Sequence, residues 1–132
     1  MLRRFGMRRL AGWGVAFVVG SLVVAGCGSS SGGTPYVAPT GPAIKTLSIS
    51  AKNFAFTPDA LTAPAGILQI DLTSSAGNHD LVIQGLPGFQ LEVSGTDTKA
   101  SGKVLLKKGK YTFYCDIPGH RSSGMEGTLT VT

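Results

Sequence analysis

The sequence predicts an all-β domain in residues 44–132, an antiparallel Greek-key sandwich or barrel of about seven to eight strands. Apolar and polar residues alternate there with the period of two that is typical of half-buried strands. The alternating runs are short, and Gly, Pro and Asn turn signals separate them. No long stretch of this region shows the period of an amphipathic helix.

Residues 1–26 are predicted to be a signal peptide, outside the folded domain. Arginines at positions 3, 4, 8 and 9 precede an apolar stretch of 15 residues, Leu10 to Val24, and a small-residue exit. This stretch is shorter than the roughly 20 residues that a membrane-spanning helix needs. Val24-Ala25-Gly26-Cys27 resembles a bacterial lipobox, which implies cleavage before Cys27 and lipidation of its thiol. The alternative is an uncleaved anchor followed by an ordinary Cys.

Residues 27–43 are predicted to be the lipidated Cys27 and a tether. The segment is mostly Gly, Ser, Thr and Pro, with Tyr36 as its single aromatic residue. Such a composition is too poor in apolar side chains to pack, and it favours a flexible chain. With or without cleavage, we expect the domain to be held at the membrane outside the cytoplasm, on the periplasmic or cell-surface side.

The charge of the folded part is close to neutral. The full chain carries 12 basic and 7 acidic residues, but four of the arginines belong to the signal, which leaves 8 basic against 7 acidic residues. The high isoelectric point is therefore a property of the precursor. Nothing in this balance predicts the basic surface that nucleic-acid binding requires.

The alternation places the strands in chain order. Its clearest apolar faces are Leu47, Ile49 and Ala51, then Leu68, Ile70 and Leu72, and finally Leu129 and Val131. Further strands are expected at 80–84, 89–93, 103–107 and 111–115. The core is expected to contain the aromatic side chains Phe54, Phe56, Phe89, Tyr111 and Phe113.

The loop before the last strand carries a thiol, an imidazole and a thioether. Cys115, His120 and Met125 follow the spacing C-x4-H-x4-M. Sulfur ligands select soft metals, and two imidazoles with one thiolate and a weak axial Met are the ligands of blue-copper sites. The chain has one other histidine, His79, so the ligand count closes with these four residues.

Strand parity predicts how the four residues meet. Cys115 shares a strand face with Tyr111 and Phe113, so the thiol points inward if those rings are buried. His79 begins an apolar run on what should be a neighbouring strand. A disulfide between Cys27 and Cys115 is the alternative use of the thiols, but lipid on Cys27 would leave Cys115 without a partner.

The pattern resembles the cupredoxins, the plastocyanin-like and azurin-like blue copper proteins. In that family one His follows an early core strand, and Cys, His and Met come from the loop before the last strand. The resemblance also covers Phe54, Phe56, Pro58, Pro64-Ala65-Gly66 and the closing run 127–131. It implies one type 1 copper held by His79, Cys115, His120 and Met125. The family usually has Asn after its first His ligand to tie down the ligand loop, whereas this chain has Asp80.

This ligand set predicts a carrier of single electrons that cycles between Cu(I) and Cu(II), and not an enzyme. A binuclear copper centre needs a second Cys in the loop, and a catalytic copper needs further histidines; the chain has neither. We expect a monomer with redox partners such as cytochromes or a terminal reductase or oxidase, a membrane contact through Cys27, and no nucleic-acid partner.

Two other functions compete with the carrier. A copper-binding module for copper delivery or buffering at the cell envelope would favour an exposed site rich in Met or His. Met1 and Met7 leave with the signal, so Met125 is the one remaining Met, which favours the carrier. An adhesin-like β-sandwich without metal would make the clustering of Cys, His and Met an accident.

Strand direction also predicts where electrons pass. Cys115 ends its strand at the metal pole, so the turn of residues 107–110, with its lysines, should lie at the opposite pole. The edge of His120, beside Ile117 and Pro118, is the expected contact for partners. Tyr114 is a second candidate entry, because it is similar to the exposed Tyr that precedes the Cys in plastocyanins.

Overall fold

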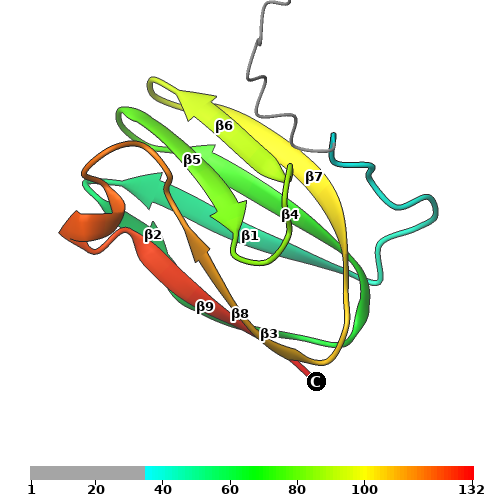
Figure 1. The fold of residues 1–132 in the computed structure, drawn as a ribbon. Helices are drawn as coiled ribbons and strands as arrows, with labels where there is room; N and C mark the ends of the chain where they lie inside the picture. Colours follow the sequence, from blue (N-terminus) through cyan, green and yellow to red (C-terminus); the bar gives the residue numbers. More distant parts are fainter. Residues whose placement is uncertain (1–34) are drawn as a thin grey trace, which may run out of the picture. The chain divides into compact units, whose positions relative to one another are not determined.

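The computed structural model describes residues 35–132, which form a β-sandwich of nine strands and one short 3₁₀ helix, η1 (Figure 1). The predicted fold class is confirmed. The signal peptide and the lipidation site at Cys27 fall outside the described residues. Among residues 35–132, no helix has the length and apolar character needed to cross a membrane.

The first sheet has four strands. Their spatial order is β2 (Ala55–Thr57), β1 (Lys45–Lys52), β4 (Gly66–Ser74) and β7 (Thr98–Leu106). The central pair β1 and β4 runs parallel, from Lys45 opposite Leu68 to Ala51 opposite Ser74. The outer pairs of this sheet are antiparallel.

The second sheet has five strands. Their order is β3 (Ala60–Ala63), β9 (Glu126–Val131), β8 (Gly109–Tyr114), β5 (Asn78–Ile83) and β6 (Gln90–Ser94). Its edge pair, β3 with β9, is also parallel. The sandwich therefore has nine strands in two mixed sheets, whereas the sequence predicted seven to eight antiparallel strands. The short strands β2 and β3 account for the difference in number.

The inward faces of the two sheets make one core. In β1 and β4 the predicted apolar sets are the buried ones, and their polar neighbours face outward. The same holds for Leu129 and Val131 in β9. Three of the five aromatic residues expected in the core are buried there, namely Phe56, Phe89 and Phe113. Burial of these apolar side chains is the main force that holds the sheets together.

Phe54 does not belong to the core, which corrects the prediction. Its side chain is 48% exposed, because it lies in the turn between β1 and β2 and not on a strand face. Tyr111 is only half-buried, and its hydroxyl donates a hydrogen bond to the Lys107 carbonyl, 2.9 Å away.

Contacts of Tyr36 and Gly41 tie residues 35–44 to the domain, although most of this segment is exposed, whereas the sequence predicted that 27–43 would be a flexible tether. The ring of Tyr36 meets Phe89 edge to face at 5.2 Å, and its hydroxyl donates to the Lys103 carbonyl at 2.8 Å. The Lys103 ammonium in turn donates to the Gly41 carbonyl at 2.8 Å. Burial raises the pKa of the Tyr36 hydroxyl. We call residues 35–44 the strap.

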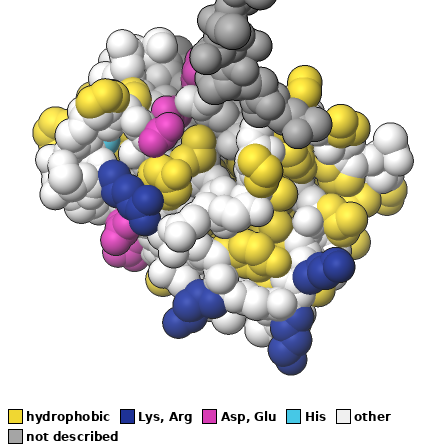
Figure 2. All heavy atoms as spheres, in the orientation of Figure 1, with side chains coloured by type: hydrophobic (Ala, Val, Ile, Leu, Met, Phe, Trp, Pro, Cys, Tyr) yellow, Lys and Arg dark blue, Asp and Glu magenta, His cyan; other side chains and the backbone are white. Residues whose placement is uncertain are grey.

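The strap and the predicted metal loop lie at opposite ends of the sandwich (Figure 1). The strap joins the end where β1 and β4 begin, since the Ile44 amide donates to the Ile67 carbonyl. The loop after β8 lies at the end where β4 leads into β5. On the face drawn in Figure 2 the Lys and Arg side chains stand apart from one another.

Candidate metal centre

Three of the four predicted ligands converge at one end of the sandwich. His79 is the second residue of β5, Cys115 directly follows β8, and His120 directly precedes η1 (Arg121–Ser123). One potential ligand atom from each lies within 4.8 Å of those of the other two. Cys115 lies 36 residues after His79 and 5 residues before His120, and the fold brings the three together. The potential metal ligands are thus two imidazoles and one thiol.

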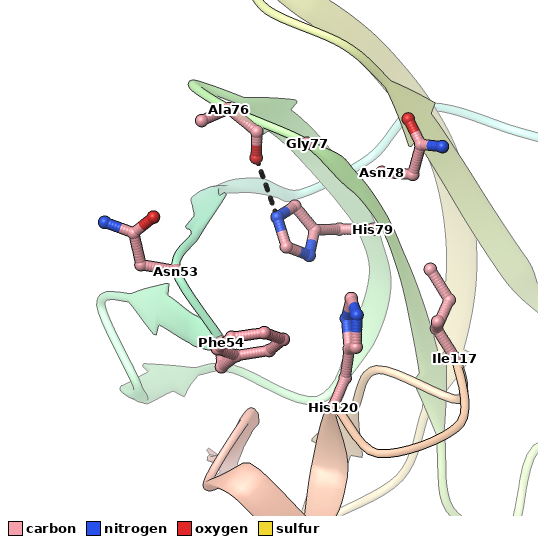
Figure 3. Close-up of a pocket in the computed structure, with 8 residues that line it drawn as sticks. All are labelled: Asn53, Phe54, Ala76, Gly77, Asn78, His79, Ile117 and His120. Atoms are coloured by element: carbon pink, nitrogen blue, oxygen red, sulfur yellow. Dashed lines mark hydrogen bonds between the residues drawn. The ribbon is translucent and has the colours of Figure 1, made fainter.

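The Nδ1 nitrogen of His79 has no hydrogen-bond partner among residues 35–132, and it points toward the site where the three side chains meet. His79 Nε2 is 2.8 Å from the Ala76 carbonyl and donates to it, so in the neutral imidazole Nδ1 is the nitrogen with a free lone pair. Nδ1 is buried, and no residue of 35–132 bonds to it. An unpaired buried acceptor is costly unless something occupies its lone pair. Figure 3 shows this nitrogen directed toward the ring of His120, where a bound metal ion would satisfy it.

Cys115 supplies the thiol from a fully buried position. Its Sγ lies 3.3 Å from His120 Nδ1 and 3.5 Å from the Asp80 amide, which donates to it. Burial raises the pKa of the Cys115 thiol, although backbone N–H groups of Asp80 and Ile117 partly oppose that rise. The metal-free site therefore holds a neutral thiol, which must lose its proton to become a ligand.

Met125 is fully buried and is linked to both neighbouring ligand candidates through the backbone. Its carbonyl accepts from the Cys115 amide and its amide donates to the His120 carbonyl, each at 3.1 Å. These two bonds close the loop of residues 115–125 on itself. Backbone hydrogen bonds therefore hold together the loop that carries the three candidates.

Asp80 ties the loop to β5. One carboxylate oxygen accepts from the Asp116 amide, and the other accepts from the Gln90 side-chain amide at 3.0 Å. Both bonds require an acceptor, so the carboxylate serves where the family usually has Asn. The sequence did not reveal Gln90 as the second partner, because the pairing of β5 with β6 brings it there.

The family assignment follows from a sequence comparison. The model of the family described as copper binding proteins, plastocyanin/azurin family, matches residues 43–132. This chain belongs to that family. The predicted relationship is therefore confirmed, and copper is the cofactor of the cupredoxin site. A search of curated proteins gave no match.

Solved structures similar to this cupredoxin include three auracyanins. Auracyanin B has a TM-score of 0.64 at 21% identity, over 76% of this chain and 96% of that one. Reduced auracyanin from the photosynthetic bacterium Roseiflexus castenholzii has a TM-score of 0.57 at 21% identity, over 69% and 99% of the two chains. Auracyanin A, a "blue" copper protein from the green thermophilic photosynthetic bacterium Chloroflexus aurantiacus, has a TM-score of 0.56 at 19% identity, over 66% and 98%. These likenesses support the fold.

A cavity of about 480 Å³ opens beside the two histidines of the cupredoxin site (Figure 3). Its walls are the β1–β2 turn, the segment before β5 and the ligand loop, and they carry no charged side chain. Phe54 lies across it from His79 and meets His120 edge to face. Sequence reasoning placed Phe54 in the core and did not predict its contact with His120, because that contact forms only when the β1–β2 turn and the ligand loop come together in the fold.

Arg121 covers the predicted second entry for electrons. Its guanidinium lies 4.0 Å from the centre of the Tyr114 ring. The same side chain pairs with Glu126 at 3.0 Å and donates to Gln84 at 3.3 Å. The contacts pin η1 against β8 and β9, and they place a guanidinium between Tyr114 and solvent.

Proposed function

We propose that this cupredoxin is a membrane-anchored, extracytoplasmic carrier of single electrons, with His79, Cys115, His120 and Met125 as the ligands of one type 1 copper. The observation that supports this most directly is the buried, unpaired Nδ1 of His79, which points at His120 beside the Cys115 thiol. Copper, when bound, supplies the Cu(I)/Cu(II) couple. The hydrogen-bonded loop and the anchored His79 ring would keep the same ligand geometry in the Cu(I) and Cu(II) states. An unchanged geometry favours electron transfer, because little rearrangement accompanies it.

The burial of the ligands supports a carrier rather than an enzyme or a delivery protein. Cys115 and Met125 are fully buried and His79 is 5% exposed, so neither a substrate nor a receiving protein can reach the metal position from those sides. His120, half-buried, is the one proposed ligand whose ring edge is accessible. Electrons would therefore enter and leave through the His120 edge, with redox proteins as partners.

The colour of the copper protein tests the ligand set. The chain from residue 28 onward should take up one copper and absorb strongly in the visible range as Cu(II), with the narrow EPR splitting of a type 1 site. Cys115→Ser should lose that colour because the absorption arises from the thiolate bond, whereas Met125→Leu should keep it and have a higher potential, since loss of the weak axial ligand favours Cu(I). Persistent colour in Cys115→Ser would refute the assignment.

Membrane anchoring through Cys27 has its own test. The full-length precursor should yield a protein in the membrane fraction whose N-terminal residue is a lipid-modified Cys27, as mass spectrometry can establish. Cys27→Ser should lose the lipid modification, because a hydroxyl cannot replace the thiol, and the copper colour of the domain should be unchanged. A parent protein in the membrane fraction with residues 1–26 still attached and an unmodified Cys27 would favour the uncleaved anchor.

A further inference from the structure

The turn that joins β1 to β2 holds an aromatic residue in a strained position. Lys52 pairs with Ala55, so Asn53 and Phe54 are the two central residues of a tight hairpin. Their φ angles are 47° and 59°, both in the left-handed region. A two-residue hairpin of this kind favours Asn followed by Gly, because a side chain with a Cβ is disfavoured at positive φ. Asn53 fits this rule, and Phe54 breaks it.

Burial does not compensate for this strain. Phe54 leaves 48% of its surface exposed, while Phe56, two residues later, is 4% exposed and packs against Phe113. A large apolar side chain that is both strained and exposed contributes little to the core. Backbone strain of this kind clusters at functional sites, where the surrounding structure holds the residue in its strained conformation.

The ring of Phe54 instead lies edge-on to the imidazole of His120. The two ring centroids are 4.9 Å apart and the planes meet at 88°, which is a favourable edge-to-face geometry. The His120 ring also lies 5.3 Å from that of His79. Figure 3 shows the three rings around one cavity, contributed by the β1–β2 turn, β5 and the ligand loop.

The two histidines are oriented in different ways. His79 is buried, and a hydrogen bond from Nε2 to the Ala76 carbonyl fixes its ring. His120 is half-exposed, and within residues 35–132 its Nε2 has no hydrogen-bond partner. Cys115 Sγ, 3.3 Å from Nδ1, contacts the His120 imidazole on its inner side, and Phe54 provides the contact on the open side of the site.

We propose that Phe54 is a positioning residue that holds the His120 ring with Nδ1 toward Cys115. The role rests on the proposed function only in that His120 is taken as a copper ligand. Phe54 itself has no atom that could serve as a metal ligand, and it would act through its contact with His120. The strained turn is the means by which the hairpin brings the ring to the mouth of the site.

Three variants separate this role from a structural one. Phe54→Gly removes the ring and relieves the turn, Phe54→Leu removes the aromatic contact but keeps the strain, and Phe54→Tyr keeps both. In the metal-free chain, Phe54→Gly should unfold at the same urea concentration as the parent or at a higher one. A large loss of stability in Phe54→Gly would mean that the residue is simply part of the core, and would overturn the proposal.

The orientation of His120 is read directly by NMR of the metal-free chain with labelled histidine. In Phe54→Gly and Phe54→Leu the His120 ring signals should shift and broaden, while those of His79 stay in place. In Phe54→Tyr both rings should match the parent. Unchanged His120 signals in the Gly and Leu variants would also overturn the proposal, whether or not the chain binds copper.

Copper affinity gives the final comparison. Loss of one aromatic pair should raise the Cu(I) dissociation constant about two- to tenfold in Phe54→Gly and Phe54→Leu, with Phe54→Tyr near the parent value. Equal affinities in all four proteins would contradict the positioning role. If the parent itself failed to bind copper, the proposed function would fail, but the NMR comparison of the His120 ring would still decide the role of Phe54.

Discussion

At the metal end of the sandwich, single side chains hold neighbouring segments of the chain in place. Asp80 is the clearest case, because it is 5% exposed and its two oxygens accept from the Asp116 backbone and from Gln90. The two hydrogen bonds offset part of the cost of burying this carboxylate, and removing it would leave buried N–H donors without an acceptor, which is also costly. The ligand loop therefore depends on this carboxylate.

Removing the carboxylate should destabilise the domain. Asp80→Ala leaves the Asp116 amide without its partner, and the free energy of unfolding should fall by about 1–3 kcal/mol in the metal-free protein, as urea unfolding would measure. Asp80→Asn is the control, since its carbonyl oxygen can still accept from Asp116, and it should lose distinctly less. Equal losses would show that the charge of Asp80, and not its acceptor, matters.

Copper binding should depend on pH through Cys115. Burial raises the pKa of the Cys115 thiol, so at neutral pH the metal-free protein holds a proton that a bound metal displaces. Each pH unit below that pKa should then weaken Cu(I) binding about tenfold, so affinity should rise from pH 7 to pH 9 in competition with a Cu(I) chelator. Cys115→Ser should lose this slope. A flat profile in the parent would mean that the thiolate is already formed.

At the scale of elements, the close packing of β8 and β9 positions the ligand loop. Gly127 in β9 faces Phe113 in β8, and the turn before β3 presses on the same point. A Cβ at Gly127 would lie 2.3 Å from Phe113 Cζ and 2.5 Å from the Asp59 carbonyl oxygen. Phe113 is two residues from Cys115 on the same strand face, so a shift here would reach the thiol.

Gly127→Ala should consequently destabilise the sandwich. The new methyl group cannot fit unless Phe113 or the Asp59 backbone moves, which should cost about 1–3 kcal/mol in the free energy of unfolding. Gly102→Ala is a matched control in β7, because its Cβ would meet only the side chains of Leu91 and Phe89, at 3.0 Å. Thermal unfolding of both variants makes the comparison, and a milder effect at Gly127 than at Gly102 would contradict the packing argument.

Local sequence patterns predicted β1, β4 and β9 well, but they missed the short strands and the first half of β7 (Thr98–Leu106). Period-two burial identifies β1, β4 and β9, because each has one face in the core and one outside. The three-residue β2 and four-residue β3 are too short to show a period. Parallel pairing of β1 with β4 depends on how distant segments meet, which alternation within one strand does not encode.

The metal site was more predictable than its surroundings. The spacing of Cys115, His120 and Met125, with one further His, allowed a single ligand set. Phe54 and Arg121 could not be assigned in this way, because their contacts with His120 and Tyr114 arise only when separate strands fold together. Phe54 was wrongly expected in the core, since an apolar residue among strands usually belongs there.

For the whole molecule, the exchange of electrons should depend on one pole. Pro118 is exposed beside His120, while Lys108 lies in the turn between β7 and β8, at the end away from the site. Pro118→Glu should slow electron self-exchange, because two copies would then bring like charges together at the contact. Lys108→Ala is the control and should leave the rate nearly unchanged. The opposite pattern, measured by NMR line broadening in mixed oxidation states, would place the electron route elsewhere.

The strap limits how far the copper centre can travel from a membrane. If Cys27 carries lipid as proposed, residues 27–36 connect the lipid to the domain. Nine chain steps span at most about 30 Å even when fully stretched. The strap lies at the end of the sandwich opposite His120. The nine residues of β4 give the domain a length of about 30 Å. Upright, the domain would carry its copper several tens of ångströms above the bilayer. A partner whose redox group projects to that height could be met without tilting, whereas one flush with the lipid would require the domain to lie on its side.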